Sequence, residues 1–200
     1  MKQSLVTLDL EGVLVPEIWV AVAERTGIAE LRRTTRDEPD YDKLMRYRLD
    51  ILGRHRLGLA KIQEVIGSLQ PLPGALEFLR ALRAELQVVI LSDTFEQFAA
   101  PLLRQLEWPT LLCHRLVVEN DRITGYRLRV ADGKRRAVAM FQGLSYQVIA
   151  AGDSFNDLGM LQQADHAFLF RATDAFAKQY AAFPALTEYA DLLRGIRGRL

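Results

Sequence analysis

The sequence predicts an α/β protein with a doubly wound, largely parallel sheet of the Rossmann-like kind. Three short apolar segments, residues 4–8, 87–91 and 147–151, each read as a buried strand that runs directly into polar residues. Between them lie stretches with the apolar spacing of helices, such as residues 75–82 and 158–162. Strands that alternate with helices are typical of a parallel sheet covered on both faces. In such sheets ligands bind outside the carboxyl ends of the strands, where the polar residues converge.

The composition indicates an ordinary globular protein of one domain, alone or with an insertion. Half of the 200 residues are hydrophobic and 26% are charged. The 26 basic and 25 acidic side chains nearly cancel to a net charge of +1, and no long block of one sign occurs. We therefore expect neither a nucleic acid nor a membrane surface as a partner.

The cysteine count and the shortness of the apolar runs argue against a disulfide-stabilised protein, a cysteine metal cluster and a membrane-spanning helix. Cys113 is alone, so one chain cannot build a disulfide framework or a cysteine metal cluster, and its apolar surroundings favour a buried thiol. The first residues do not resemble a signal peptide, and no run of 18 apolar residues occurs. A cytoplasmic location is the default expectation.

Residues 15–71 interrupt the alternation, because they contain several helical patterns and no convincing strand. We expect them to form a helical cap domain, inserted into a catalytic core of residues 1–14 and 72–200. One cap helix is predicted behind a start signal at residues 37–40, with these apolar residues on one stripe: Tyr41, Leu44, Met45, Leu49 and Leu52. Arg48 falls on the same stripe.

Two further elements are predicted in the core. Residues 116–118 and 123–128, joined by Asn120 and Asp121, read as a β-hairpin. Residues 95–99 read as helical, but Pro101 favours a break there and a new helix that starts near the proline.

Asp9 and Glu11 stand two residues apart after the first predicted strand, so in an extended chain their carboxylates would face the same side. Asp9 could attack phosphorus and be transiently phosphorylated, while Glu11 protonates the leaving alcohol and later deprotonates an acceptor. The alternative is structural, since acidic pairs after strands often cap helices or form turns.

A second acidic cluster, Asp153 and Asp157, follows the third predicted strand. Mg²⁺ prefers oxygen ligands and takes few of them from protein. Asp9 and Asp153 suit this preference, and Asp157 would orient a ligand or a water behind them. Helix capping by Ser154 or Asn156 is an alternative that is compatible with metal binding.

Ser92, after the second strand, and Lys134, at the start of a predicted helix, offer donors for the nonbridging oxygens of a phosphate. Each has a plainer interpretation, because a serine after a strand often forms a turn and Lys134 lies in a basic stretch typical of a solvated face. The order of the four motifs along the chain favours the catalytic interpretation.

In that order and in those settings, the four motifs resemble those of the haloacid-dehalogenase superfamily. The cap after the first motif resembles the phosphoserine phosphatase branch. Residues 9–17 and 150–157 further resemble the bifunctional phosphoserine phosphatase/homoserine phosphotransferase proteins, which share glutamate at the position of Glu11, where the superfamily normally has aspartate.

This resemblance implies a Mg²⁺-dependent phosphatase that acts on O-phosphoserine through a phosphoaspartate and also transfers the phosphoryl group to homoserine. It implies metal binding by the Asp9 carboxylate, the backbone carbonyl of Glu11 and Asp153, and phosphate binding by Ser92 and Lys134. It places Glu17 and Arg48 at the amino and carboxylate groups of serine. Two neighbours of these motifs complete the substrate-binding candidates: Asp93 and Asn156.

Arg48 has an independent reason to bind an anion, because an unpaired guanidinium on an apolar stripe is expensive to bury. Two other interpretations of Arg48 stay open: its side chain could reach solvent, or it could form an ion pair with an acidic residue of the cap. Glu17, beside Pro16, could equally open a cap helix. The three histidines match no metal-ligand spacing, so surface or packing roles are expected for His55, His114 and His166.

Other readings of the whole chain stay open. A phosphoacceptor signalling module would present similar groups on a similar sheet, but the cap and Glu11 oppose it. A phosphatase for another small phosphometabolite and a noncatalytic phosphometabolite-binding protein are further alternatives. The oligomeric state is also open, with a homodimer as one candidate.

Overall fold

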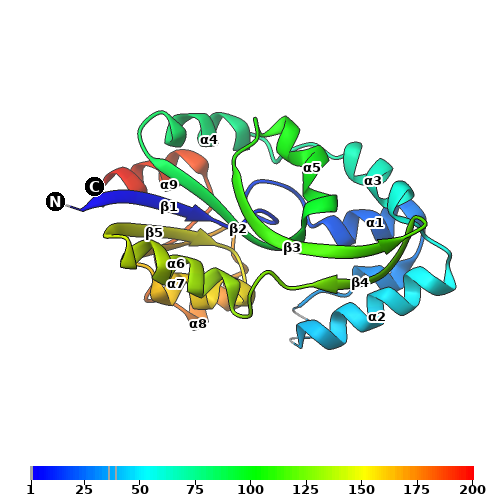
Figure 1. Ribbon diagram of the computed structural model, residues 1–200. Helices are drawn as coiled ribbons and strands as arrows, with labels where there is room; N and C mark the ends of the chain where they lie inside the picture. The colour runs from blue at the N-terminus through cyan, green and yellow to red at the C-terminus, as the bar shows by residue number, and fades with distance from the viewer. Residues whose placement is uncertain (1, 36, 39) are drawn as a thin grey trace.

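A seven-stranded sheet organises the residues that the computed structural model describes, which are 2–35, 37–38 and 40–200 (Figure 1). Its strand order is β4-β3-β2-β1-β5-β6-β7. The strands are β1 (Gln3–Leu8), β2 (Gln87–Phe95), β3 (Thr110–Glu119), β4 (Arg122–Arg127), β5 (Tyr146–Gly152), β6 (His166–Phe170) and β7 (Ala185–Leu186).

The strand order reverses at β1: successive strands are added on one side of β1 up to β4 and on its other side from β5 onward. β1 pairs in parallel with β2 on the first side and with β5 on the second. The β2–β3, β5–β6 and β6–β7 pairs are also parallel, and β3 and β4 pair antiparallel. This arrangement confirms the predicted doubly wound sheet. Its switch point places a ligand crevice beyond the carboxyl ends of β1 and β5.

Helices cover both faces of the sheet (Figure 1). One face packs against α4 (Ala75–Arg83), α5 (Glu96–Gln105) and α9 (Tyr189–Arg197). The other packs against α6 (Gly133–Gly143), α7 (Leu158–Gln163) and α8 (Asp174–Gln179). Within the described part of the chain, no helix has the length and apolar character needed to cross a membrane.

The segment between β1 and α4 is helical, as expected. It contains α1 (Ile18–Thr26), the 3₁₀ helix η1 (Ala29–Arg32), α2 (Tyr41–Arg54) and α3 (Leu59–Gly67). Asp40 caps α2, since its carboxylate accepts from the backbone N–H groups of Asp42 and Lys43 at 3.1 Å. Pro39, part of the predicted start signal, lies outside the described residues.

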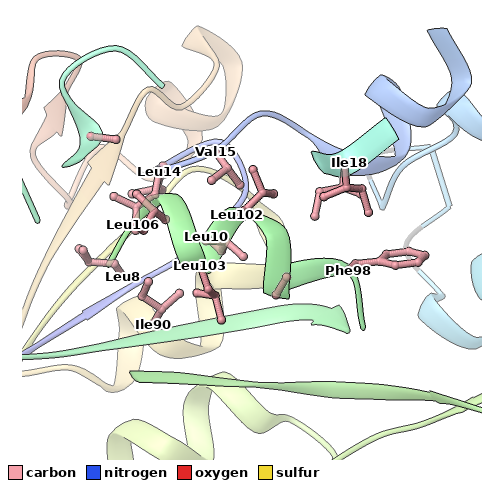
Figure 2. Close-up of a cluster of buried hydrophobic side chains, with 14 of the residues drawn as sticks. Leu8, Leu10, Leu14, Val15, Ile18, Ile90, Phe98, Leu102, Leu103 and Leu106 are labelled. Atoms are coloured by element: carbon pink, nitrogen blue, oxygen red, sulfur yellow. The ribbon is translucent and has the colours of Figure 1, made fainter. Parts of the chain in front are cut away.

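The inserted helices share one hydrophobic core with the sheet. Figure 2 shows Leu10 and Leu14, from the loop after β1, gathered against Leu102 of α5 and Leu106 directly after that helix. Farther along the same cluster, the ring of Trp19 in α1 meets Phe98 of α5 edge-on, with centroids 5.3 Å apart. The loop that carries the first acidic motif is therefore held by apolar contacts on the face of the sheet that also supports the insertion.

The predicted break at Pro101 is wrong, because α5 continues through the proline from Glu96 to Gln105. Proline has no N–H, so the carbonyl of Gln97, four residues earlier, loses its helical donor. That carbonyl accepts instead from the side-chain amide of Gln63 in α3, at 2.9 Å. A tertiary contact from the insertion thus replaces the hydrogen bond that the proline removes.

The hairpin is confirmed, although its first strand is longer than predicted. β3 begins at Thr110 as a parallel neighbour of β2 and ends as the antiparallel partner of β4. Asn120 and Asp121 turn the chain with φ of +49° and +68°, the left-handed region that tight hairpin turns require. Cys113 in β3 is buried as expected, and burial raises the pKa of its thiol to about 11.

Candidate active site

The ends of β1 and β5 bring three buried carboxylates together. Leu8 of β1 is opposite Ala151 of β5, and the backbone N–H of Asp9 extends this ladder by donating to Ala151 at 3.0 Å. The side chains that follow meet at the carboxyl ends of the strands. Oxygens of Asp9, Asp153 and Asp157 lie within 4.8 Å of one another.

Two glycines allow this close approach. Gly12 adopts φ +77°, and a Cβ there would lie 2.8 Å from the Asp153 carboxylate. A Cβ on Gly152 would lie 2.4 Å from the carboxylate carbon of Asp157. Asp157 can therefore fold back, so that its Oδ2 accepts from the backbone N–H groups of Asp153 at 2.9 Å and Ser154 at 3.1 Å. These bonds tie Asp157, the last residue of the 3₁₀ helix η2 (Phe155–Asp157), to the backbone that precedes the helix.

Lys134, in the first turn of α6, bridges two of the acids. Its Nζ lies 2.8 Å from Asp9 Oδ1 and 2.6 Å from Asp157 Oδ1, and its side chain is 5% exposed. The solvated face considered for this lysine is therefore wrong. Burial disfavours the ammonium form, but the charges of Asp157 and Asp9 outweigh burial and raise the pKa of Lys134 well above its usual value.

The cluster has the chemistry of a cation site. Burial and the charges of Asp157 and Asp153 raise the pKa of Asp9, while Lys134 opposes the shift. Several carboxylates held this close repel one another, and a divalent cation among them would remove that repulsion. The oxygen-only donor set also suits a hard cation. The described residues therefore fit a metal ion at this position.

Glu11 lies in the loop that leaves β1 and faces the same cavity as Asp9. The strand ends at Leu8, so the extended geometry considered for the two acids does not persist. Glu11 Oε2 accepts from the backbone N–H of Ile18 at 2.8 Å. Burial and the charge of Glu17 raise the pKa of Glu11 to about 7, against the hydrogen bond from Ile18 and the charge of Arg48. Such a group can both donate and accept a proton near neutrality.

The cavity above the acids collects most of the predicted site residues from distant parts of the chain. Its volume is about 60 Å³. The predicted residues that line it are Asp9, Glu11, Glu17, Arg48, Ser92, Asp93, Asp153 and Asn156. Lys134 and Asp157 join this group through their contacts with Asp9 and with each other. The structure thus brings every predicted site residue into one place.

Arg48 points its guanidinium toward this cavity and does not reach solvent. It is 5% exposed, its Nη2 donates to the Arg33 carbonyl at 2.9 Å, and its guanidinium carbon lies 4.5 Å from the ring centre of Trp19. Among the described residues its buried Nε has no hydrogen-bond partner. Burial lowers the pKa of Arg48 to about 10, against the charge of Glu11. A carboxylate ligand would satisfy such a group.

Glu17 immediately precedes α1, yet its side chain makes no capping hydrogen bond to that helix. It lines the cavity instead, close enough to Glu11 for its charge to raise the pKa of Glu11. Glu17 therefore occupies the N-cap position that the helix-opening alternative implies, and its side chain also lines the cavity.

Ser92 and Asp93 follow the regular part of β2, whose last regular pair with β3 is at Leu91. Ser92 is 5% exposed and its Oγ accepts from the backbone N–H of Thr94 at 3.2 Å. Asp93 Oδ2 accepts from the amide of Asn156 at 3.2 Å, which ties the end of β2 to the segment after β5. Asp93 and Asn156 are thus partners of each other as well as cavity residues.

Six cavity residues were not predicted as site residues: Trp19, Thr34, Thr35, Tyr41, Thr94 and Ser154. The sequence places Tyr41 on the apolar stripe of a helix. Trp19 lies in the hydrophobic core and Tyr41 packs against it, but both side chains also line the cavity, which no spacing rule reveals. Phe95, by contrast, is a core residue, with 1% exposure.

Known proteins resemble this chain over nearly its whole length. The haloacid dehalogenase-like hydrolase family model matches residues 4–165. Phosphoserine phosphatase ThrH of Pseudomonas aeruginosa is 56% identical over 192 residues, which cover 96% of this chain and 94% of the relative. A phosphoserine phosphatase of Pseudomonas syringae pv. tomato is 57% identical over 190 residues, covering 94% of this chain and 80% of the relative.

A solved structure of a phosphoserine phosphatase in apo form shares the fold. Its TM-score is 0.76 at 19% sequence identity, and the match covers 94% of each chain. The matched family segment contains every residue of the candidate site, from Asp9 to Asp157.

Proposed function

Because the chain belongs to the haloacid dehalogenase-like hydrolase family, we propose that it is a Mg²⁺-dependent phosphatase acting on O-phosphoserine. Asp9 is the nucleophile, and the resulting phosphoaspartate passes its phosphoryl group to water or to homoserine. The proposal rests mainly on one arrangement: Asp9 contacts Lys134, and both lie beneath a cavity that Glu11 also lines. The phosphoserine phosphatase relatives, more than half identical over most of this chain, support the choice of substrate.

Each group has a defined part in the reaction. An Asp9 oxygen attacks phosphorus, and the bond to the serine oxygen breaks as Glu11 gives that oxygen a proton. Glu11, now a carboxylate, takes the proton of the acceptor hydroxyl as that oxygen attacks the phosphoaspartate and Asp9 leaves. Ser92 and Lys134 donate to the nonbridging oxygens throughout.

Mg²⁺ would be held by the Asp9 carboxylate, the backbone carbonyl of Glu11 and Asp153, with Asp157 behind them. Its charge would offset that of the phosphate when it is bound. Asp157 already holds Lys134 and the backbone after β5, so it stabilises the position of Asp153.

The substrate end of the cavity suits a small amino acid. The Arg48 guanidinium would meet the carboxylate and Glu17 the ammonium group, while Asp93 and Asn156 border the same space. A cavity of about 60 Å³ beneath the helices of residues 15–71 favours a small phosphorylated molecule over a phosphorylated protein. We propose that these residues act as a cap over the core and that the protein is cytoplasmic.

The decisive experiment measures serine and phosphate release from O-phosphoserine separately, with and without Mg²⁺ and homoserine. Removing divalent cations should lower turnover by at least about 100-fold, because metal charge stabilisation is worth several kcal/mol, and added Mg²⁺ should restore it. Homoserine should raise serine release above phosphate release, with O-phosphohomoserine as the balance. Equal release of the two products at every homoserine concentration would contradict the transferase half of the proposal.

Replacing Arg48 with methionine should raise the KM for phosphoserine by about 10- to 100-fold, because a charged hydrogen bond is worth about 1.5–3 kcal/mol. Methionine keeps an unbranched apolar side chain but loses the guanidinium, together with its contact with the Trp19 ring. Arg54→Met, on the exposed side of the same helix, is the matched control and should leave KM unchanged. An unchanged KM in Arg48→Met would remove this residue from substrate binding.

A phosphoacceptor signalling module remains the alternative from another class. It would hold one phosphoryl group for minutes to hours and would not turn over repeatedly. The pKa of Glu11, raised by burial to about 7, supports the enzyme, because repeated turnover needs a proton carrier beside Asp9.

A further inference from the structure

The segment that carries Ser92 is not held by a regular strand ladder. Leu91 of β2 pairs with Leu112 of β3, but the next pair joins Phe95 to His114. Residues 92–94 therefore stand opposite Cys113 alone, and this segment, the phosphate turn, bulges out of the sheet. A bulge re-aims side chains toward a site but loses ladder hydrogen bonds, so other contacts must hold it in place.

His114 of β3 lies beside the phosphate turn, and its hydrogen bonds determine which ring nitrogen carries the hydrogen. It is 6% exposed, and its Nδ1 accepts from the backbone N–H of Arg129 at 3.2 Å. A ring nitrogen that accepts carries no hydrogen, so the hydrogen of the neutral ring is on Nε2. That Nε2 lies 3.4 Å from Asp93 Oδ1. The backbone N–H of Arg129, just after β4, thus determines that the ring nitrogen facing Asp93 is the one that carries the hydrogen.

Asp93 connects the parts of the site. Its carbonyl accepts from the hydroxyl of Tyr41 in α2 at 2.8 Å, and its Oδ2 accepts from Asn156 after β5 at 3.2 Å. Burial disfavours its charge, but the Lys134 charge and the hydrogen bonds from His114 and Asn156 lower the pKa of Asp93 to about 2. The Asp93 side chain is partly buried, with 30% of its surface exposed, so its ionised carboxylate depends on these donors for its position, and the loss of one should displace it.

We propose that His114 is a positioning residue for phosphoryl transfer, which holds the Asp93 carboxylate through Nε2 and thereby keeps Ser92 and Asn156 in place. It does not touch the reacting atoms. The inference rests on the proposed function, since it assigns the phosphate turn to phosphate binding.

A role in packing alone is the competing explanation, because the His114 ring also contacts aromatic rings. Its centroid lies 6.0 Å from that of Tyr41 and 6.5 Å from that of Phe95. Two substitutions separate the explanations. His114→Phe keeps an aromatic ring and removes both hydrogen bonds, whereas His114→Gln removes the ring and keeps an N–H donor near the position of Nε2. The residue borders a cavity of about 480 Å³, which gives the larger phenyl ring space.

The experiment measures kcat and KM for phosphoserine, inhibition by inorganic phosphate, and the thermal midpoint of each variant. We expect His114→Phe to lower kcat/KM by about 10-fold and to weaken phosphate inhibition, since one hydrogen bond to a charged group is lost. His114→Gln should recover most of both while melting no higher than His114→Phe. In an Asp93→Ala background, His114→Phe should have no further effect on kcat/KM.

The opposite ranking, with His114→Phe as active as the wild type and His114→Gln impaired, would overturn the proposal in favour of packing. If His114→Phe does not fold, His114→Asn takes its place, because the shorter amide reaches the position of Nδ1 and not that of Nε2; equal activity of the Asn and Gln variants would then overturn it. Failure of the proposed function is distinguishable, since it would appear as a wild-type chain without phosphatase activity.

Discussion

Asparagine in place of Asp9 is expected to lower phosphate release from phosphoserine by about 10⁴-fold or more, the order of effect seen when a catalytic nucleophile is removed. The amide is close in size to the carboxylate, and its oxygen can still accept from the backbone N–H of Leu10, which donates to Asp9 at 2.7 Å. Its nitrogen cannot attack phosphorus. The variant should therefore keep the fold and lose the reaction.

The measurement has two parts, steady-state phosphate release and the mass of acid-quenched enzyme after mixing with phosphoserine. Wild-type enzyme should carry one phosphoryl group on the peptide that contains Asp9, and the variant none. Asp174→Asn, an exposed change of the same kind in the first turn of α8, should behave as wild type. Turnover by Asp9→Asn at the wild-type rate would sink the central proposal.

Glutamine in place of Glu11 is expected to lower kcat for phosphoserine by about 10²- to 10⁴-fold, the usual worth of general acid and base catalysis. The amide oxygen can still accept from Ile18, so the loop should keep its shape. With p-nitrophenyl phosphate the first step should suffer less, because nitrophenolate leaves without a proton. The variant should then release about one equivalent of nitrophenol rapidly and turn over slowly, as the acceptor lacks its base.

Aspartate in place of Glu11 tests whether the length of the side chain matters separately from its acidity. Glu11→Asp keeps the carboxylate on a side chain shorter by one methylene and should lie between glutamine and wild type in kcat. A Glu11→Gln variant with no burst and an equal loss on both substrates would show that Glu11 supports the loop and does not move protons.

The strand pattern was predictable because burial on both faces leaves continuous apolar runs. Residues 4–8, 87–91 and 147–151 became β1, part of β2 and part of β5 for that reason. The course of the chain near Pro101 was not predictable, since the donor that replaces its missing N–H is Gln63, which lies 38 positions earlier and reaches α5 only in the folded chain. Local propensity rules contain no such partner.

The kinds of residue in the site were predictable, since carboxylates and a hydroxyl after strands, with a lysine at the start of a helix, have few other joint uses. Their roles within the site depended on the structure. Lys134 could have been solvated by its basic neighbours, and only burial between Asp9 and Asp157 excludes this. His114 carried no signal at all, because its partner Asp93 is reached across a bulge between two strands.

The sequence by itself determined the sheet, the helical insertion and the acid that we propose as the nucleophile, because hydrophobic periodicity and the polar residues after each strand are local properties. Only the tertiary structure decided how those groups are charged and held. The pKa values of Glu11 and Arg48, the bridge made by Lys134 and the support of the phosphate turn all arise from burial and from contacts between segments far apart in the chain. Electrostatic energies depend on distance and solvent exposure in space, which the order of residues does not contain.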